Sequence, residues 1–251
     1  MYPGNYNPYT FKSFTPAVEH MPLLQAMYAE KHRHYHDIGH IYYLLGKLKE
    51  FIHNNNEIKR DHHAIYTATV IAIWWHDAVY SPYGTNGHNE EESAALMYKA
   101  YGSRNVMGAQ FAKDDVHRWA HTAILATAKH LTELKFEKYT HFDPDLMVLM
   151  GEEYSSEVQV TRILLDVDMA GFAENMSIVE KNSNAVIKEY EALGIHPRTM
   201  LENRCAFLTK LIEKKSIFYT DYFKEKSEKN ARINIEESIR RSEIALGRGD
   251  R

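Results

Sequence analysis

The residues best suited to chemistry are a histidine and an aspartate that stand side by side, His76 and Asp77. They end the apolar, aromatic run from Val70 to Trp75, and a cluster of histidines that ends in His40 precedes them along the chain. A neutral imidazole and a carboxylate are suitable ligands for a divalent cation. The pair therefore predicts a metal site, provided that other parts of the chain supply the remaining ligands.

A second source of carboxylates is the stretch LLDVDM at 164–169, where two acids stand among apolar residues. Burying a carboxylate costs several kcal/mol unless a cation or hydrogen-bond donors compensate it. His76 and Asp77 would diverge within an ideal helix, because successive side chains point in different directions, but they can converge at a helix end. One of the two acids would then complete a ligand set with His40, His76 and Asp77.

Long amphipathic stretches predict that helices position these residues. From Asp37, apolar residues recur at intervals of three and four positions until Asn54, and the next helix ends in Trp75-His76-Asp77 with apolar residues on all sides. Seven prolines and twelve glycines fall mostly between such stretches, so we expect a mainly α protein. Further helices are expected from Thr15 to about Glu30, from Asn89 onward, and over about 114–130, 155–169, 178–193, 197–215 and 228–246.

Composition narrows the function classes. A chain of 251 residues with 44% hydrophobic residues can bury a sizeable core, and we expect one domain, with 1–16 as an N-terminal extension and 197–251 as a C-terminal helical scaffold. The single Cys205 argues against a disulfide framework and against Cys-rich zinc modules. The net charge of −4 does not favour stable nucleic-acid binding. No signal peptide or bilayer-length apolar run is found, so we expect a cytoplasmic protein without membrane contact.

Several strings around the histidines resemble a known family. His40, His76-Asp77 and Asp168 look like the H...HD...D pattern of the HD superfamily of metal-dependent phosphohydrolases. The surrounding strings resemble an uncharacterised branch of predicted members with RHYH, HDxVY, NExxSA, ATxxH and DAD-like motifs. They are Arg33 to His36, His76 to Tyr80, Asn89-Glu90 with Ser93-Ala94, Ala126-Thr127 with His130, and Asp166-Val167-Asp168. The resemblance spans about 28–239, with Val167 and Met169 as departures where that branch usually has alanine and leucine.

The resemblance implies an all-α, HD-domain helical bundle with additional C-terminal helices. His40, His76, Asp77 and Asp168 would hold one divalent ion, of Mn, Mg, Fe, Co, Ni or Zn, and Asp77 would also serve catalysis. A water acidified by this ion would attack phosphorus. The expected activity is hydrolysis of a phosphate ester or anhydride, and a nucleotide or nucleoside phosphate is the expected substrate class.

Other residues near these strings have open roles. Glu90 is expected either to serve as a catalytic acid or base or only to answer the helix dipole. Arg33, His34 and His36 could bind substrate phosphate, or His36 could instead orient His40. His130 is expected to contact phosphate or to hold a second metal.

Two alternative functions remain open at this point. One is a regulatory module that binds metal and nucleotide without turnover. The other is di-iron oxygenase chemistry, which would need His117, His121 and His130 to complete a second iron site. His117 and His121 share one helix face at a spacing that can chelate a metal, but a surface or groove pair is favoured. A homodimer is compatible with the sequence.

Overall fold

The computed structural model describes residues 18–54, 62–81, 87–102, 110–131, 156–192 and 194–248. Within these ranges the chain forms nine α-helices and no strand, so the predicted all-α class is confirmed. The expected N-terminal extension and the helix start at Thr15 lie outside the described residues. The helices are α1 (Met21–Tyr28), α2 (Ile38–Asn54), α3 (His62–Trp75), α4 (His88–Gly102), α5 (Gln110–Thr127), α7 (Ser156–Met169), α8 (Met176–Glu191), α9 (Pro197–Ile212) and α10 (Asp221–Ala245).

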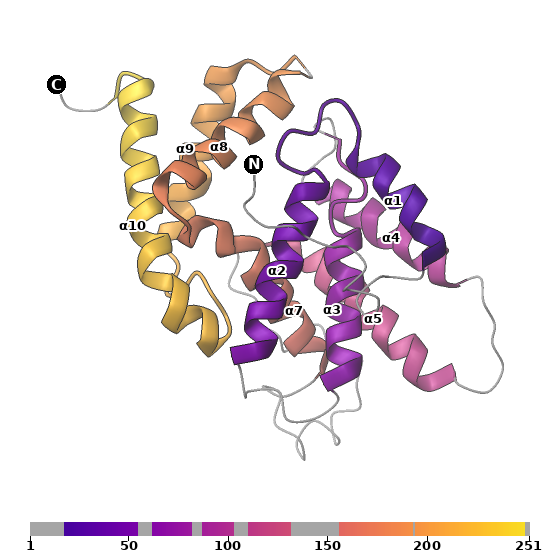
Figure 1. Cartoon of the computed structure of the whole chain (residues 1–251). Helices are drawn as coiled ribbons and strands as arrows, with labels where there is room; N and C mark the ends of the chain where they lie inside the picture. Colours follow the sequence, from indigo (N-terminus) through magenta and orange to yellow (C-terminus); the bar gives the residue numbers. More distant parts are fainter. Residues whose placement is uncertain are drawn as a thin grey trace.

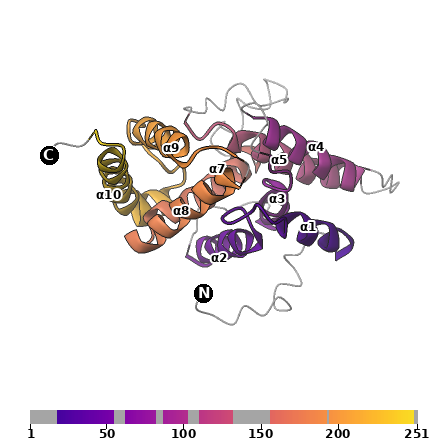
Figure 2. The same cartoon turned by 90° about the horizontal axis from the view of Figure 1, so that it is seen from above.

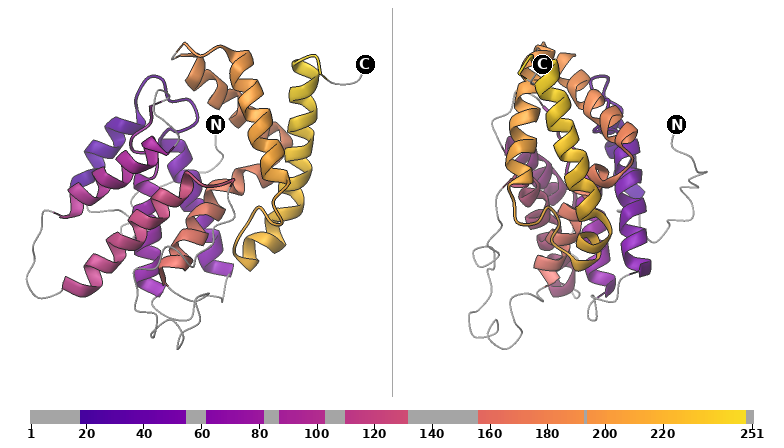
Figure 3. Two further views of the ribbon diagram at one scale, coloured as in Figure 1. Left: turned by 180° about the vertical axis from the view of Figure 1, so that it is seen from behind. Right: turned by 90° about the vertical axis from the view of Figure 1, so that its left-hand side faces the viewer.

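The helix α7 joins two groups of helices (Figures 1 and 2). On one side α7 packs against α2, α3 and α5, and α5 also packs against α3 and α4. On the other side its continuation, the 3-10 turn Ala170–Ala173, packs against α8 and α10. Figure 3 shows α9 and α10 side by side in this second group, where they are in contact. The end of α7 therefore lies where the two groups meet.

The helix α3 is central because it is apolar on every side, as its sequence predicts. Trp74 and Trp75 are 2% and 0% exposed, and the buried faces of α2 and α7 belong to the same core cluster. Burying such large side chains contributes about 1.5–3 kcal/mol each or more. None of the helices in the described part combines the length and the hydrophobicity needed to cross a bilayer.

Two helix ends bring the candidate ligands into place. Asp37 caps α2, because its Oδ1 accepts hydrogen bonds from the backbone N–H groups of Gly39 (2.8 Å) and His40 (3.1 Å). The helix α3 ends at Trp75, so His76 and Asp77 lie in the turn that follows it and not within the helix as the periodicity predicts. Because α3 ends before His76, the side chains of His76 and Asp77 do not follow helical geometry and can face the same point.

Buried Asp166 ties the segment before α10 to α7. Its carboxylate accepts hydrogen bonds from the backbone N–H groups of Tyr219 (2.7 Å) and Thr220 (2.8 Å) and from the Thr220 hydroxyl (2.7 Å). Thr220 also caps α10 by accepting from the N–H of Phe223. The helix α10 therefore begins at Asp221, seven residues before the predicted start at Glu228. The alternating charges after Glu225 gave no sign of this cap.

We predict that replacing Thr220 by valine lowers the free energy of unfolding by about 1–3 kcal/mol, because the isosteric side chain loses both the cap and the hydrogen bond to Asp166. Urea denaturation measures this change. Thr199→Val on α9, where the side chain is exposed, is the matched control and should change stability by less than about 0.5 kcal/mol. Equal losses in the two variants would contradict the assignment.

Candidate metal centre

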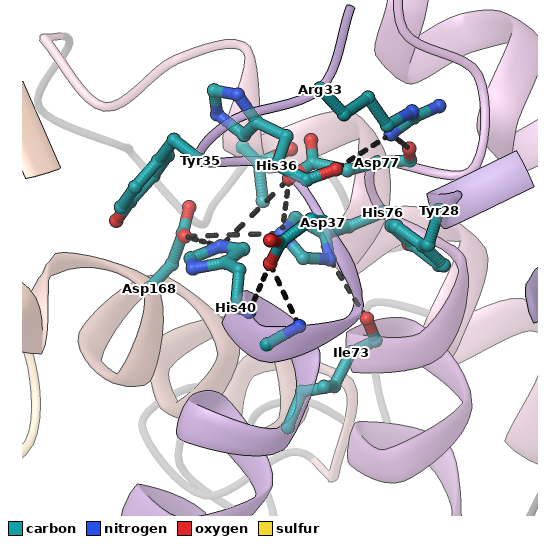
Figure 4. Close-up of polar contacts among 12 residues, drawn as sticks. Tyr28, Arg33, Tyr35, His36, Asp37, His40, Ile73, His76, Asp77 and Asp168 are labelled. Atoms are coloured by element: carbon teal, nitrogen blue, oxygen red, sulfur yellow. Dashed lines mark hydrogen bonds and ion pairs between the residues drawn. The ribbon is translucent and has the colours of Figure 1, made fainter. Parts of the chain in front are cut away.

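Two histidines and an aspartate form a group that could hold a metal ion. His40, His76 and Asp77 each offer one ligand atom, and these atoms all lie within 4.8 Å of one another. Figure 4 shows the three side chains converging, His40 from the first turn of α2 and the others from the turn after α3. Both histidines are buried, and the Asp77 side chain is 19% exposed. The group is therefore enclosed by protein but accessible from one side.

The ring of His76 is oriented as a metal-binding histidine requires. Its Nδ1 donates a hydrogen bond to the backbone oxygen of Ile73 at 2.9 Å, and a carbonyl can only accept. In the neutral ring, Nε2 therefore carries the lone pair. That Nε2 is buried without a hydrogen-bond partner in the described structure, as is the Nε2 of His40. Buried polar atoms normally make hydrogen bonds, so two nitrogens of one group that make none are suited to bind a metal ion.

Asp168, at the end of α7, approaches the two histidines from the other helix group. Its Oδ1 lies 3.3 Å from Nε2 of His40 and 3.9 Å from Nε2 of His76. Asp168 is not a member of the group formed by His40, His76 and Asp77, whose ligand atoms all lie within 4.8 Å of one another. Its Oδ2 accepts a hydrogen bond from Nε2 of His130 at 2.9 Å. The structure thus brings Asp168 beside the histidines and makes His130 its partner.

These separations fit His40, His76 and Asp77 as ligands around one ion, with Asp168 beside them. Asp77 Oδ2 lies 3.0 Å from Nε2 of His76 and 3.9 Å from Nε2 of His40. Ligands that bind one ion at about 2.0–2.2 Å stand roughly 3 Å apart when adjacent and up to about 4.4 Å apart when opposite. The four nitrogen–oxygen separations lie within this interval. Nitrogen and oxygen donors of this kind suit Zn²⁺ and the divalent ions Mn²⁺, Fe²⁺, Co²⁺ and Ni²⁺.

The charges in this group shift several pKa values. Burial alone would lower the pKa of His76, but the negative charges of Asp77 and Asp168 outweigh burial and raise this pKa to about 9. Burial opposes ionisation of both carboxyls, yet the neighbouring imidazoles hold the pKa of Asp77 and that of Asp168 below their usual range. Without a cation, the proton on His76 offsets part of this negative charge. A divalent ion would take the place of that proton.

Arg33 holds backbone in place, in contrast to the expectation that it binds phosphate. Its side chain is 0% exposed, and Nε donates to Glu30. Nη1 donates to the backbone oxygens of His36 (3.1 Å) and Asp77 (2.7 Å), and Nη2 donates to that of Ala78 (2.9 Å). The guanidinium is occupied by these acceptors and links the segment before α2 to the turn after α3. Arg33 thus positions Asp77.

Glu189, on α8, fixes the histidine-rich segment before α2. Its Oε1 accepts from the backbone N–H groups of His34, Tyr35 and His36 at 2.7–2.8 Å. Its Oε2 lies 2.7 Å from Nδ1 of His36. Burial opposes ionisation of Glu189, but these donors lower its pKa to about 2. The same contacts, with the charge of Asp77, raise the pKa of His36 against the effect of burial. The side chain of His34 is exposed.

The remaining predicted residues lie apart from the His40 group. Glu90 is in the first turn of α4, and within the described ranges it makes no hydrogen bond or ion pair with that group, so the dipole role is the one its position favours. His117 stacks on Tyr101, and His121 meets the ring of Tyr98 edge to face. Both tyrosines belong to α4, so the two histidines contribute to the packing of α5 against α4.

A cavity of about 190 Å³ opens beside the metal-binding group. His36, His130 and Asp168 line it together with two polar residues that we did not predict, Asn182 and Arg204. Arg204 belongs to α9, within the segment expected to be only a scaffold. Nothing in the sequence places Arg204 at the same cavity as Asp168. The apolar lining comes from Met169, Phe172, Val179, Val186 and Phe207.

Comparisons of the chain with protein-family models, with curated proteins and with solved structures give no match. The helical architecture and the histidine–aspartate group are compatible with an HD-type fold.

We predict that the metal-free protein binds about one equivalent of a divalent ion and releases about one proton as it does so at pH 7. The reason is that His76, with its pKa raised to about 9, is protonated below pH 9 and must lose its proton to bind metal. Apparent affinity should therefore rise with pH between pH 6.5 and 8.5, by up to about tenfold per unit. Calorimetry in two buffers of different ionisation enthalpy measures the proton. His76→Ala should abolish binding, and pH-independent binding would contradict the site.

Proposed function

We propose that this protein is a divalent-metal-dependent phosphohydrolase of the HD type. The observation that carries the proposal is the pair of buried, unpaired Nε2 atoms of His40 and His76, which face two carboxylates next to a cavity. This donor set matches the H...HD...D pattern in the sequence. Because fold alone does not fix function, the proposal rests on the site and on the motif together.

His40, His76, Asp77 and Asp168 would hold the ion. An ion bound there would acidify a water and polarise a phosphoryl oxygen. The chain's own residues would fix the ligands: Ile73 orients the ring of His76, Arg33 holds the backbone at Asp77, and His130 orients Asp168. Ligands held in this way keep their geometry when the substrate binds.

His36 is suited to donate a proton to the leaving oxygen of the substrate. It lines the cavity, and its raised pKa keeps the imidazole protonated closer to neutral pH. The contact with buried Glu189 fixes the orientation of the ring and stabilises its charge. A positioned acid with a pKa near the working pH is effective in general acid catalysis. We assign this role to His36 in place of Glu90.

The resemblance supports a nucleotide or nucleoside phosphate as substrate. The cavity of about 190 Å³ is smaller than the sites of drug-sized ligands, which measure about 300–1,000 Å³. It therefore suits a phosphate group with a small body, or only the phosphate end of a nucleotide. Small phosphomonoesters accordingly belong in any test beside nucleotides. A module that binds metal and nucleotide without turnover is the alternative, and the same test separates the two.

We predict that the protein loaded with Mn²⁺ or Co²⁺ releases phosphate from at least one member of a panel of nucleoside mono-, di- and triphosphates and small phosphomonoesters. Asp77→Ala should lower this activity by at least about 100-fold, because it removes a ligand of the ion. Asp221→Ala is the matched control, since the side chain of Asp221 is 77% exposed, and it should retain activity.

Full activity in Asp77→Ala would refute the assigned site. Metal and nucleotide binding without phosphate release from any compound would favour the regulatory module.

A further inference from the structure

Arg204 is the arginine that lines the cavity beside the metal-binding group. It lies in the middle of α9 and shares the cavity wall with His36, His130 and Asp168. Its guanidinium carbon stands 5.8 Å from the centre of the Phe172 ring. This cation–π contact orients the guanidinium group but uses none of its N–H donors.

The charge of Arg204 has no anionic partner in the described structure. Its Nε is buried and makes no hydrogen bond, and Arg204 forms no ion pair with a described carboxylate. Burial lowers the pKa of Arg204, but an arginine remains charged in proteins. A buried charge without a partner is costly, so a guanidinium in this position favours an anion that binds next to it.

Two other arginines of the chain, Arg33 and Arg232, show what a structural role looks like. Arg33 donates to Glu30 and to three backbone carbonyls. Arg232 donates to Glu228 and to the backbone oxygens of Ile212, Lys214 and Lys215. Arg204 differs from both, since its donors have no such acceptors and it lies at a cavity.

We propose that Arg204 binds the phosphoryl oxygens of the substrate and is the anion-binding residue of this cavity. The inference rests on the proposed hydrolysis, and it moves the phosphate-binding role expected for Arg33 to a residue of α9. A planar guanidinium fork matches the oxygens of a phosphate and binds them through two parallel hydrogen bonds. Asn182, whose side chain also lines the cavity, supplies amide donors and an acceptor nearby.

The rest of the lining defines the substrate that fits. Phe172 and Phe207 form apolar walls with Met169, Val179 and Val186. The anion binds between Arg204 and the metal ligands, and the body of the substrate contacts these apolar side chains. The class is therefore a phosphate monoester or anhydride with a small or flat apolar group, in preference to a highly charged polyphosphate.

Calorimetric titration with inorganic phosphate, a product of the proposed reaction, tests the proposal in the Mn²⁺-loaded and in the metal-free protein. Arg204→Met should weaken phosphate binding by about 10- to 100-fold and leave the metal content unchanged. Its melting temperature without phosphate should stay the same or rise, because the variant removes an unpaired buried charge. Arg198→Met is the matched control on the same helix, with a side chain that is 57% exposed.

Phosphate binding by Arg204→Met as tight as that of the unchanged protein would overturn the proposal and leave the proposed hydrolysis standing. A lower melting temperature with unchanged phosphate affinity would likewise show a structural arginine. Absence of phosphate binding to the unchanged protein at millimolar concentration, with and without Mn²⁺, would also overturn it. Failure of the unchanged protein to bind Mn²⁺ would instead count against the proposed hydrolase. Titration of the metal-free protein with phosphate would still show whether Arg204 binds the anion.

Discussion

The structure depends on two buried imidazole nitrogens that no hydrogen-bond donor or acceptor of the described chain satisfies. Nε2 of His40 and Nε2 of His76 face the carboxylates of Asp77 and Asp168 across 3.0–3.9 Å. Without a cation, this arrangement gathers two carboxylates, and their charges raise the pKa of His76 to about 9. A divalent ion would bind the two nitrogens and the Asp77 carboxylate and would offset the charge of the nearby Asp168, so metal binding would also stabilise the fold.

Three buried ionic residues connect this group to the surrounding helices. Arg33 links the segment before α2 to the turn after α3, and Glu189 links that same segment to α8. Asp166, two residues before Asp168, ties α7 to the start of α10. Each is a buried ionisable side chain whose hydrogen bonds go largely to backbone groups, and the loss of one side of such a buried hydrogen bond is destabilising. These three residues fix the relative positions of metal ligands that come from the two groups of helices.

Sequence reasoning found the helices and the ligands because both leave a local pattern. Apolar periodicity located α2 and α3, and His76-Asp77 stood out against the apolar helix that precedes it. The roles of Arg33 and Arg204 leave no such pattern, since a sequence does not show whether a guanidinium meets carbonyls or an empty cavity. Glu189 looks like any polar residue of an amphipathic helix. Its role appears only when α8 lies against the segment before α2, a contact between distant parts of the chain.

A crystal structure of the Mn²⁺-loaded protein, with an anomalous difference map recorded for manganese, tests metal binding by His40, His76 and Asp77 directly. We expect one strong peak within about 2.0–2.3 Å of Nε2 of His40, Nε2 of His76 and a carboxylate oxygen of Asp77, with Asp168 as the fourth ligand. No peak in this group, or a peak held by other side chains while His40 and His76 remain unpaired, would contradict this expectation.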